Sequence, residues 1–345
     1  MSGEQGHSGQ FGWVHWLRVL AAVSVVAVHV CAKDYTEHPV TGSAWQTMAV
    51  IEVLLRWSVP VFVMISGALL LDPARELPLK KLFGKYFLRI LTALIVWSLG
   101  FAVLYIGLYL REGLPEILEY ARVGHPHLWY LYMLLGLYLV TPLLRALARE
   151  RALLRYFTVL AGVFALLLPT LGQFGLLPLT RYFAGRLEVH LVLGYTGYFV
   201  LGRLLATAET TRPQRLALYV LALLATIAAA LIDGLGSLAR GEIYTPFVSE
   251  FSPNAALQAS ALFLLLRECC RGRETPRLIR ALSGLSFGIY LLHPVPIDLL
   301  RRFCGLGTLT VHPLLSVPLI TLLSVAFSAA VTAVMKKIPI LKNLV

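Results

Sequence analysis

Long apolar runs, each near the length that crosses a lipid bilayer, follow one another along the chain. We expect ten helical spans, at about residues 13–33, 46–71, 85–110, 126–144, 153–171, 191–207, 215–235, 253–270, 281–301 and 313–335. About 20 consecutive apolar residues suffice to cross the hydrocarbon core as a helix. Turn and breaker pairs separate the runs, such as Asp72-Pro73 and His312-Pro313. The pattern predicts an all-α, polytopic integral membrane protein with about ten transmembrane helices.

Composition supports this class. Of the 345 residues, 58% are hydrophobic and only 14% are charged, which excludes an ordinary soluble domain. The first ten residues are polar, and no small-residue cleavage site follows the first apolar run. We therefore expect that run to be retained after a short tail, residues 1–12, and residues 1–345 to form a single membrane domain. The four cysteines lack metal-ligand spacing, so we expect free thiols and no metal site.

The basic residues predict the orientation. The formal net charge is +12, and 20 of the 30 lysines and arginines fall in one set of loops against eight in the other. The positive-inside rule then places both termini in the cytoplasm, which requires an even number of spans. The charge is explained by topology and by contact with membrane lipid, so no nucleic-acid partner is expected. The predicted location is a bacterial inner (plasma) membrane, crossed many times.

The first span carries two residues that a lipid-facing helix does not need, Arg18 and His29. Their separation of eleven positions, at about 100° per residue, places them within about 20° of each other on one helix face. At 1.5 Å per residue they lie about 16 Å apart along the helix axis. An ionisable residue inside a span indicates a functional site.

The second span adds Glu52 and Arg56, an i,i+4 pair at a depth close to that of His29. A histidine beside a carboxylate can take a proton from a hydroxyl that attacks an acyl carbonyl, with the carboxylate fixing the histidine tautomer. The alternative is a packing histidine that bonds a backbone carbonyl.

Three further segments have a structural and a functional interpretation each. The basic run that contains Lys81, Lys85 and Arg89 either follows topology or binds the phosphates of a nucleotide-like donor. The run from His127 through Trp129 and Tyr130 forms either an interfacial aromatic belt or a platform for a sugar ring or acyl chain. His293, before Pro294, marks either a kink or a second polar group in the same cavity. The small residues of Ser66-Gly67 favour close helix packing.

Taken together, these segments resemble the integral-membrane acyltransferase type 3 family. The resemblance rests on Arg18 and His29 and on residues 59–70, 81–90, 127–142, 197–202 and 286–294, which occur in this order over nearly the whole chain. Residues 127–142 are most similar to the branch that contains the O-acetyltransferase of enterobacterial common antigen. The family usually has two arginines spaced three apart before the third span, whereas the nearest match here is Lys85 and Arg89, spaced four apart.

The resemblance implies an O-acyltransferase that moves an acetyl group from cytoplasmic acetyl-CoA to a sugar hydroxyl of a cell-surface or lipid-linked glycan. It implies that Arg18 and His29 are the functional pair. We expect His29, Glu52 and Arg18 to be catalytic, with His29 as the general base.

The expected ligand sites complete this hypothesis. Donor phosphates would bind at the cytoplasmic side, and the glycan acceptor at the outer side. The first set is Arg18, Lys81, Lys85 and Arg89, and the second is Arg56, His127, Trp129, Tyr130 and His293. The alternative is a multi-pass transporter or flippase of a lipid-linked saccharide or small solute, although no inverted repeat is visible.

Overall fold

The computed structural model describes residues 12–175 and 194–345, and helices are the only regular elements within these ranges. The helices are α2 (Gly12–Ala32), α3 (Ser43–Leu55), α4 (Ser58–Leu70), α5 (Leu79–Lys81), η1 (Leu82–Phe87), α6 (Leu88–Ala102), η2 (Val103–Leu110), α7 (Leu114–Val123), η3 (Pro126–Leu128), α8 (Trp129–Leu147), α9 (Arg151–Ala161), η4 (Gly162–Leu167), α10 (Leu168–Gln173), α12 (Tyr195–Thr207), α13 (Arg212–Arg240), α14 (Pro253–Cys269), α15 (Arg277–Leu292), α16 (Pro294–Cys304), α17 (Pro313–Met335) and η6 (Leu341–Asn343).

The all-helical membrane class predicted from the sequence is confirmed. Within the described residues, seven helices are long and apolar enough to cross a membrane. An eighth is added if α15 and α16, which are bent by 61° against each other, count as one span. Two predicted spans, 191–207 and 253–270, correspond to α12 and α14, which have 13 and 17 residues. Residues 191–193 lie outside the described ranges. The count of ten and the cytoplasmic termini stay predictions.

Two predicted spans differ in detail from single straight helices. The span at 46–71 is divided into α3 and α4 after Leu55, with Arg56 as the C-cap of α3. Pro60 explains the division, because it has no N–H to donate to the carbonyl of Arg56 one turn earlier. The span at 85–110 contains two π-helical segments, η1 and η2. In addition, α7 was not predicted and begins with Pro115 in its first turn.

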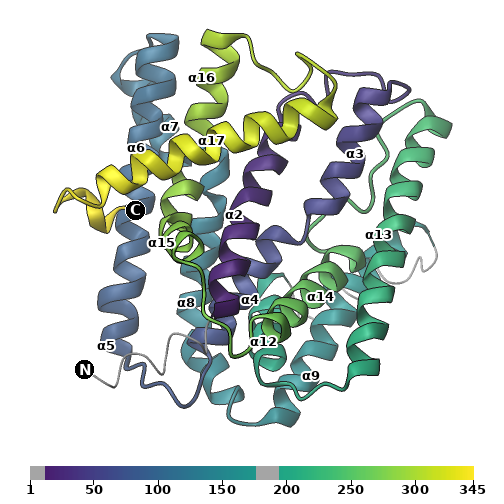
Figure 1. Cartoon of the computed structure of the whole chain (residues 1–345). Coiled ribbons are helices and arrows are strands. Elements are labelled where there is room, and N and C mark those ends of the chain that lie inside the picture. The colour runs from purple at the N-terminus through teal and green to yellow at the C-terminus, as the bar shows by residue number, and fades with distance from the viewer. Residues whose placement is uncertain (1–11, 176–193) are drawn as a thin grey trace.

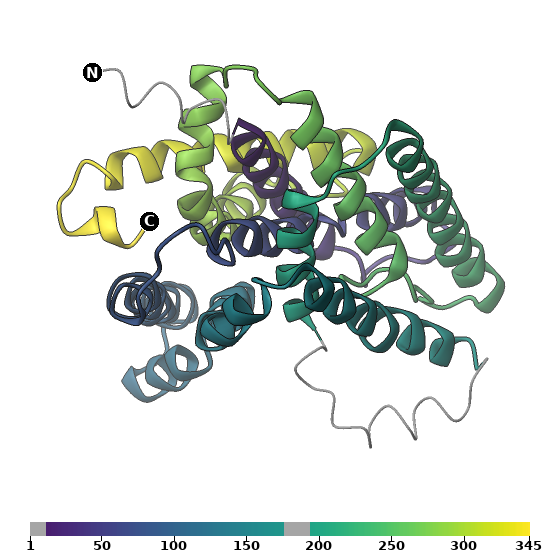
Figure 2. The ribbon, with the colours of Figure 1, turned by 90° about the horizontal axis from the view of Figure 1, so that it is seen from below.

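Helix α2 is the centre of the bundle. It packs against α3, α4, α14, α15 and α17. Helix α17 crosses it obliquely, while α6, α7 and α8 lie to one side and α13 to the other (Figures 1 and 2). An apolar helix that carries Arg18 and His29 is therefore surrounded by protein on several faces, which gives both polar side chains an environment other than lipid.

The closest helix contact joins α4 and α12. A Cβ atom at Gly67 would lie 1.7 Å from the carbonyl oxygen of Phe199, and one at Gly202 would lie 2.0 Å from that of Met64. The two backbones therefore touch at both glycines, as small residues permit in membrane helix pairs. This confirms the packing role expected for Gly67 and holds α4, which also packs against α2, in position.

Candidate functional site

A cavity of about 550 Å³ runs beside α2 and is lined by both Arg18 and His29. Its volume lies within the range of small-molecule sites in proteins. Its walls come from α2, α4, η1, α6, η3, α8 and α15, from Arg56 between α3 and α4, from the loop before α14 and from the residue after α17. The polar and aromatic residues of the lining are Arg18, His29, Arg56, Ser58, Phe62, Ser66, Tyr86, Arg89, His127, Trp129, Tyr130, Tyr138, Glu250, Ser283, Ser286, Phe287, Tyr290 and Lys336. The two α2 residues expected to share a face do share one cavity.

Three cations line the cavity without a side-chain carboxylate partner in the described parts of the chain: Arg18, Arg89 and Lys336. Arg89 donates to the carbonyl oxygen of Val345 at 2.9 Å and lies over the ring of Phe287, 5.5 Å from its centroid.

Lys336 donates to the carbonyl oxygen of Gly284. Burial and the nearby charge of Arg89 lower the pKa of the Lys336 ammonium. Three cations around one cavity favour an anionic ligand, since their side chains carry positive charge and can donate hydrogen bonds to it.

At the other end of α2, His29 has a fixed hydrogen-bonding pattern. Its Nδ1 lies 2.8 Å from the carbonyl oxygen of Val25, one turn earlier on the same helix. Because a carbonyl oxygen only accepts, Nδ1 is the donor and Nε2 keeps its lone pair. The expected partner was Glu52, so the structure gives the histidine a different tautomer-fixing group. His29 still lines the cavity, although its bond to a backbone carbonyl is the contact that the packing alternative predicted.

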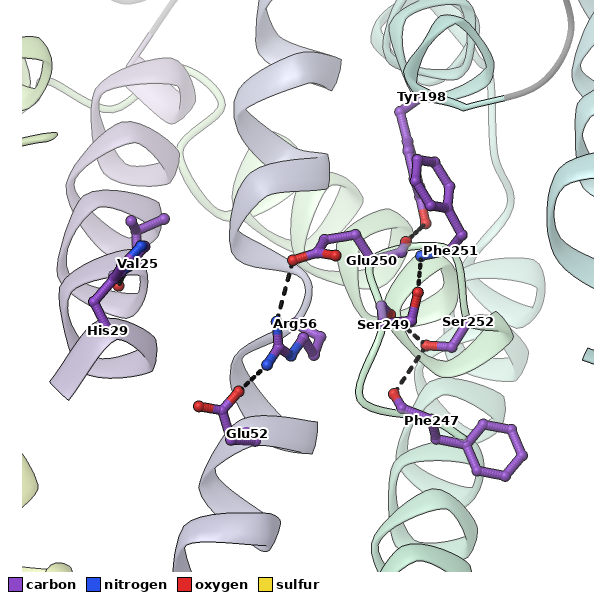
Figure 3. Close-up of polar contacts among 10 residues, drawn as sticks. All are labelled: Val25, His29, Glu52, Arg56, Tyr198, Phe247, Ser249, Glu250, Phe251 and Ser252. Carbon is purple, nitrogen blue, oxygen red and sulfur yellow. Dashed lines mark hydrogen bonds and ion pairs between the residues drawn. The ribbon is translucent and has the colours of Figure 1, made fainter. Parts of the chain in front are cut away.

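Glu52 belongs instead to an ionic triad. Arg56 bonds the carboxylate of Glu52, and its Nη1 lies 3.2 Å from Oε1 of Glu250 (Figure 3). Glu52 is 2% exposed and does not line the cavity, whereas Arg56 and Glu250 do. With both carboxylates ionised, the triad carries one positive and two negative charges.

A second histidine group lies beside His29 and depends on the break between α15 and α16. Pro294 has no N–H for the carbonyl of Tyr290, and Nδ1 of His293 bonds that oxygen at 2.6 Å instead. In the same turn, Nε2 of His127 lies 3.2 Å from the carbonyl oxygen of Leu291. The proline break thus supplies the acceptors that fix both rings.

The rings of this group contact one another. His293 lies 4.6 Å from His29 and 5.3 Å from His127, measured between ring centroids and in edge-on geometry. His293 is fully buried, and its Nε2 has no hydrogen-bond partner among the described residues. It lies behind the cavity wall, so the structure places it against His29 and outside the lining. Nδ1 of His125 lies 2.6 Å from Nδ1 of His127.

The aromatic run at the start of α8 also reaches the cavity. Its members His127, Trp129 and Tyr130 all contribute to the lining. The indole of Trp129 is 39% exposed, while His127 is buried. Tyr130 contacts Trp129 and Tyr290 through ring edges. The platform interpretation therefore has the required geometry.

The basic run before the third predicted span is divided by the structure. All three basic residues are exposed, but Arg89 lines the cavity and Lys81 and Lys85 do not. Lys85 lies in the π-helical segment η1, where the residue spacing per turn differs from that of an α-helix. Sequence reasoning missed Lys336, which counted only as a topogenic charge, and Glu250, a loop residue with no local motif.

The family comparison agrees with the geometry. The profile described as Acyltransferase domain, that of the acyltransferase type 3 family, matches residues 11–333. Comparison with curated proteins and with solved structures yields no match. The match covers nearly the whole chain, including every residue of the cavity except Lys336. The chain therefore belongs to the acyltransferase type 3 family, and the protein is a multi-pass membrane acyltransferase.

Proposed function

We propose that this acyltransferase moves an acetyl group from cytoplasmic acetyl-CoA to a hydroxyl of a cell-surface or lipid-linked glycan. The observation that carries the proposal is one cavity that holds three cations without a side-chain carboxylate partner among the described residues and, on the same helix as Arg18, a histidine with an available lone pair. These features match a donor with a phosphate-bearing end and an uncharged reactive end.

The donor is held by its charge. Arg18, Arg89 and Lys336 bind the phosphates of the nucleotide, with the guanidinium groups as planar phosphate ligands. The pantetheine arm then follows α2 over the distance of about 16 Å between positions 18 and 29. This places the thioester beside His29.

His29 acts as the general base. Its Nε2 takes the proton of the acceptor hydroxyl as the oxygen attacks the thioester carbonyl. The carbon–sulfur bond breaks as the new ester forms, and the imidazolium returns the proton to the departing thiolate. Protons therefore balance within the site. Direct transfer needs no covalent histidine intermediate.

The proposed topology follows the charge bias of the loops. The cation end of the cavity faces the cytoplasm, where acetyl-CoA is made, and the His29 end faces outward, in a bacterial inner membrane. The branch that contains the O-acetyltransferase of enterobacterial common antigen stays a prediction from residues 127–142. A transporter or flippase is not favoured, because the family is an acyltransferase family.

The test is replacement of His29. We expect His29→Gln to lose at least about a hundredfold in acetyl transfer, the lower range for loss of a general base. Transfer from radiolabelled acetyl-CoA to membrane glycan measures the effect. His38→Gln serves as a matched control, since His38 lies outside the cavity. A His29→Gln protein that inserts normally and retains wild-type transfer contradicts the proposed role.

A further inference from the structure

The loop between α13 and α14 brings one carboxylate into the cavity, that of Glu250. Its Oε1 faces Arg56, while Oε2 has no hydrogen-bond partner among the described residues. Arg56 already bonds the buried carboxylate of Glu52, so it neutralises the charge of Glu250 only in part (Figure 3). A carboxylate oxygen directed at a cavity is an acceptor for ligand hydroxyl groups.

Hydrogen bonds hold this loop in one conformation. The hydroxyl of Tyr198 donates to the carbonyl oxygen of Glu250 at 2.5 Å, and Oγ of Ser252 donates to that of Phe247 at 3.1 Å (Figure 3). The backbone N–H of Phe247 donates to Oδ1 of Asp233 on α13 at 3.2 Å. Buried polar groups therefore fix the backbone on both sides of Glu250, which pre-organises its side chain for binding.

Aromatic rings connect Glu250 to the platform on α8. Phe251, the next residue, lies 4.7 Å from the ring of Tyr195, and Tyr195 lies 5.5 Å from that of Trp129. Trp129 and Glu250 both line the cavity, and these ring contacts connect the exposed indole to the residue next to the carboxylate. An aromatic face beside a carboxylate matches the apolar face and the hydroxyl edge of a sugar ring.

The charges of the two ends are opposite. Among the described residues, the cations at the Arg18 end have no side-chain carboxylate partner, whereas Glu52 and Glu250, when both are ionised, outnumber the one positive charge of Arg56. A negatively charged ligand group next to Glu250 would be repelled at short range. The ligand of this end is therefore expected to be uncharged at the point that meets Glu250.

We infer that Trp129 and Glu250 form a subsite for a neutral sugar residue, in which Glu250 accepts hydrogen bonds from ring hydroxyls and excludes uronic acids. The inference rests on the proposed function for the idea that the acceptor is a glycan, and it specifies the chemistry of that acceptor. Glu250 thus acts as a specificity-determining residue rather than as the proton acceptor.

The experiment measures binding without donor. The full chain in lipid nanodiscs is titrated with methyl glycosides of glucose, galactose and N-acetylglucosamine, and with the matching methyl glucuronoside and galacturonoside, and saturation-transfer NMR detects binding. At least one neutral glycoside is expected to bind, and Glu250→Gln is expected to weaken it by about tenfold or more, the scale of one charge-assisted hydrogen bond. The uronosides are expected to bind the wild type more weakly than the neutral glycosides do. In Glu250→Gln, the affinity for the uronosides is expected to rise relative to the affinity for the neutral glycosides.

Glu242→Gln is the matched control, because Glu242 is exposed on the same loop and lies outside the cavity. Binding of acetyl-CoA to the Glu250→Gln protein reports its folding. Equal affinity of neutral glycosides for wild type and Glu250→Gln overturns the inference. So does uronoside binding as tight as neutral binding, or no neutral glycoside binding at all.

A separate assay of label transfer from acetyl-CoA distinguishes the two proposals. Glu250-dependent glycoside binding without transfer supports the subsite and contradicts the proposed function. Transfer together with glycoside binding that does not depend on Glu250 supports the proposed function and contradicts the subsite.

Discussion

Arg18 and His29 show what the spacing of two residues on a helix can predict about a site. Their shared face was predicted from positions alone, and both side chains line one cavity. The other charged residues of the cavity could not all be predicted, because some come from distant parts of the chain. Lys336 follows the last long helix, and Glu250 reaches Arg56 across 194 positions. The tautomer of His29 depends on a backbone carbonyl, which no sequence pattern reveals.

The two basic residues assigned together from the sequence, Lys85 and Arg89, are expected to differ in function. Arg89→Ala removes a cavity cation, so the KM for acetyl-CoA is expected to rise by about tenfold, as for loss of one charge-assisted phosphate contact. Lys85→Ala removes an exposed charge and is expected to change the KM by less than about twofold. Initial rates against acetyl-CoA concentration measure both. A larger effect of Lys85→Ala would contradict the assignment of the donor end.

At the scale of elements, the apolar runs predict the helices well and their interruptions poorly. Every predicted span contains one or more helices, because a run of apolar residues must satisfy its backbone groups internally. The break at Pro60 and the bend at Pro294 follow from a missing N–H, so the prolines indicated where they could occur. The π-helical segments have no comparable signal; Lys85 lies in one of them, and Arg89, in the helix that follows, is the one of the two that lines the cavity.

The contact between α4 and α12 is expected to tolerate no side chain. Gly202→Ala would place a Cβ atom 2.0 Å from the carbonyl oxygen of Met64, so the two backbones would have to separate. We expect a loss of about 3 kcal/mol in stability, the upper range for overpacking. Thermal unfolding in detergent measures it.

Gly136→Ala is the matched control for this substitution, since a Cβ atom there meets nothing within 4 Å. Similar unfolding temperatures for the two variants would show that the helices are not in backbone contact.

At the scale of the whole molecule, the cavity requires α4, α6, α8 and α15, with the short segments η1 and η3 and the loop before α14, to surround one space beside α2, although these elements are far apart in the sequence. The sequence supplied residues for both ends and a reason to connect them, namely the length of α2 between positions 18 and 29. It could not show that the space between them is open, because that depends on how side chains from α4, α8 and α15 pack.

An obstruction between the two ends is expected to separate donor binding from transfer. Val28 lines the cavity on α2, so Val28→Trp narrows the path toward His29 while the cations at the other end stay accessible. Acetyl-CoA binding is expected to change by less than about threefold, within the small effects of substitutions at distant sites, and acetyl transfer to fall by about a hundredfold, since misplacement of reacting groups by 1 Å has that scale of cost.

Equilibrium binding and label transfer measure these two quantities for Val28→Trp. Ile95→Trp, at a position that is 60% exposed on α6, controls for the added indole. Unchanged transfer by Val28→Trp would mean that the thioester reaches His29 by another route.

The bond from Nδ1 of His29 to the Val25 carbonyl also bears on how the product leaves. With that ring hydrogen committed to the backbone, the neutral imidazole presents only a lone pair to whatever enters the cavity. An alcohol can donate to this lone pair, whereas the ester made from it has lost the hydrogen and can only accept. In the proposed mechanism, acylation therefore abolishes the hydrogen bond that holds the acceptor at Nε2, and we expect the finished ester to dissociate more readily than the alcohol from which it is made.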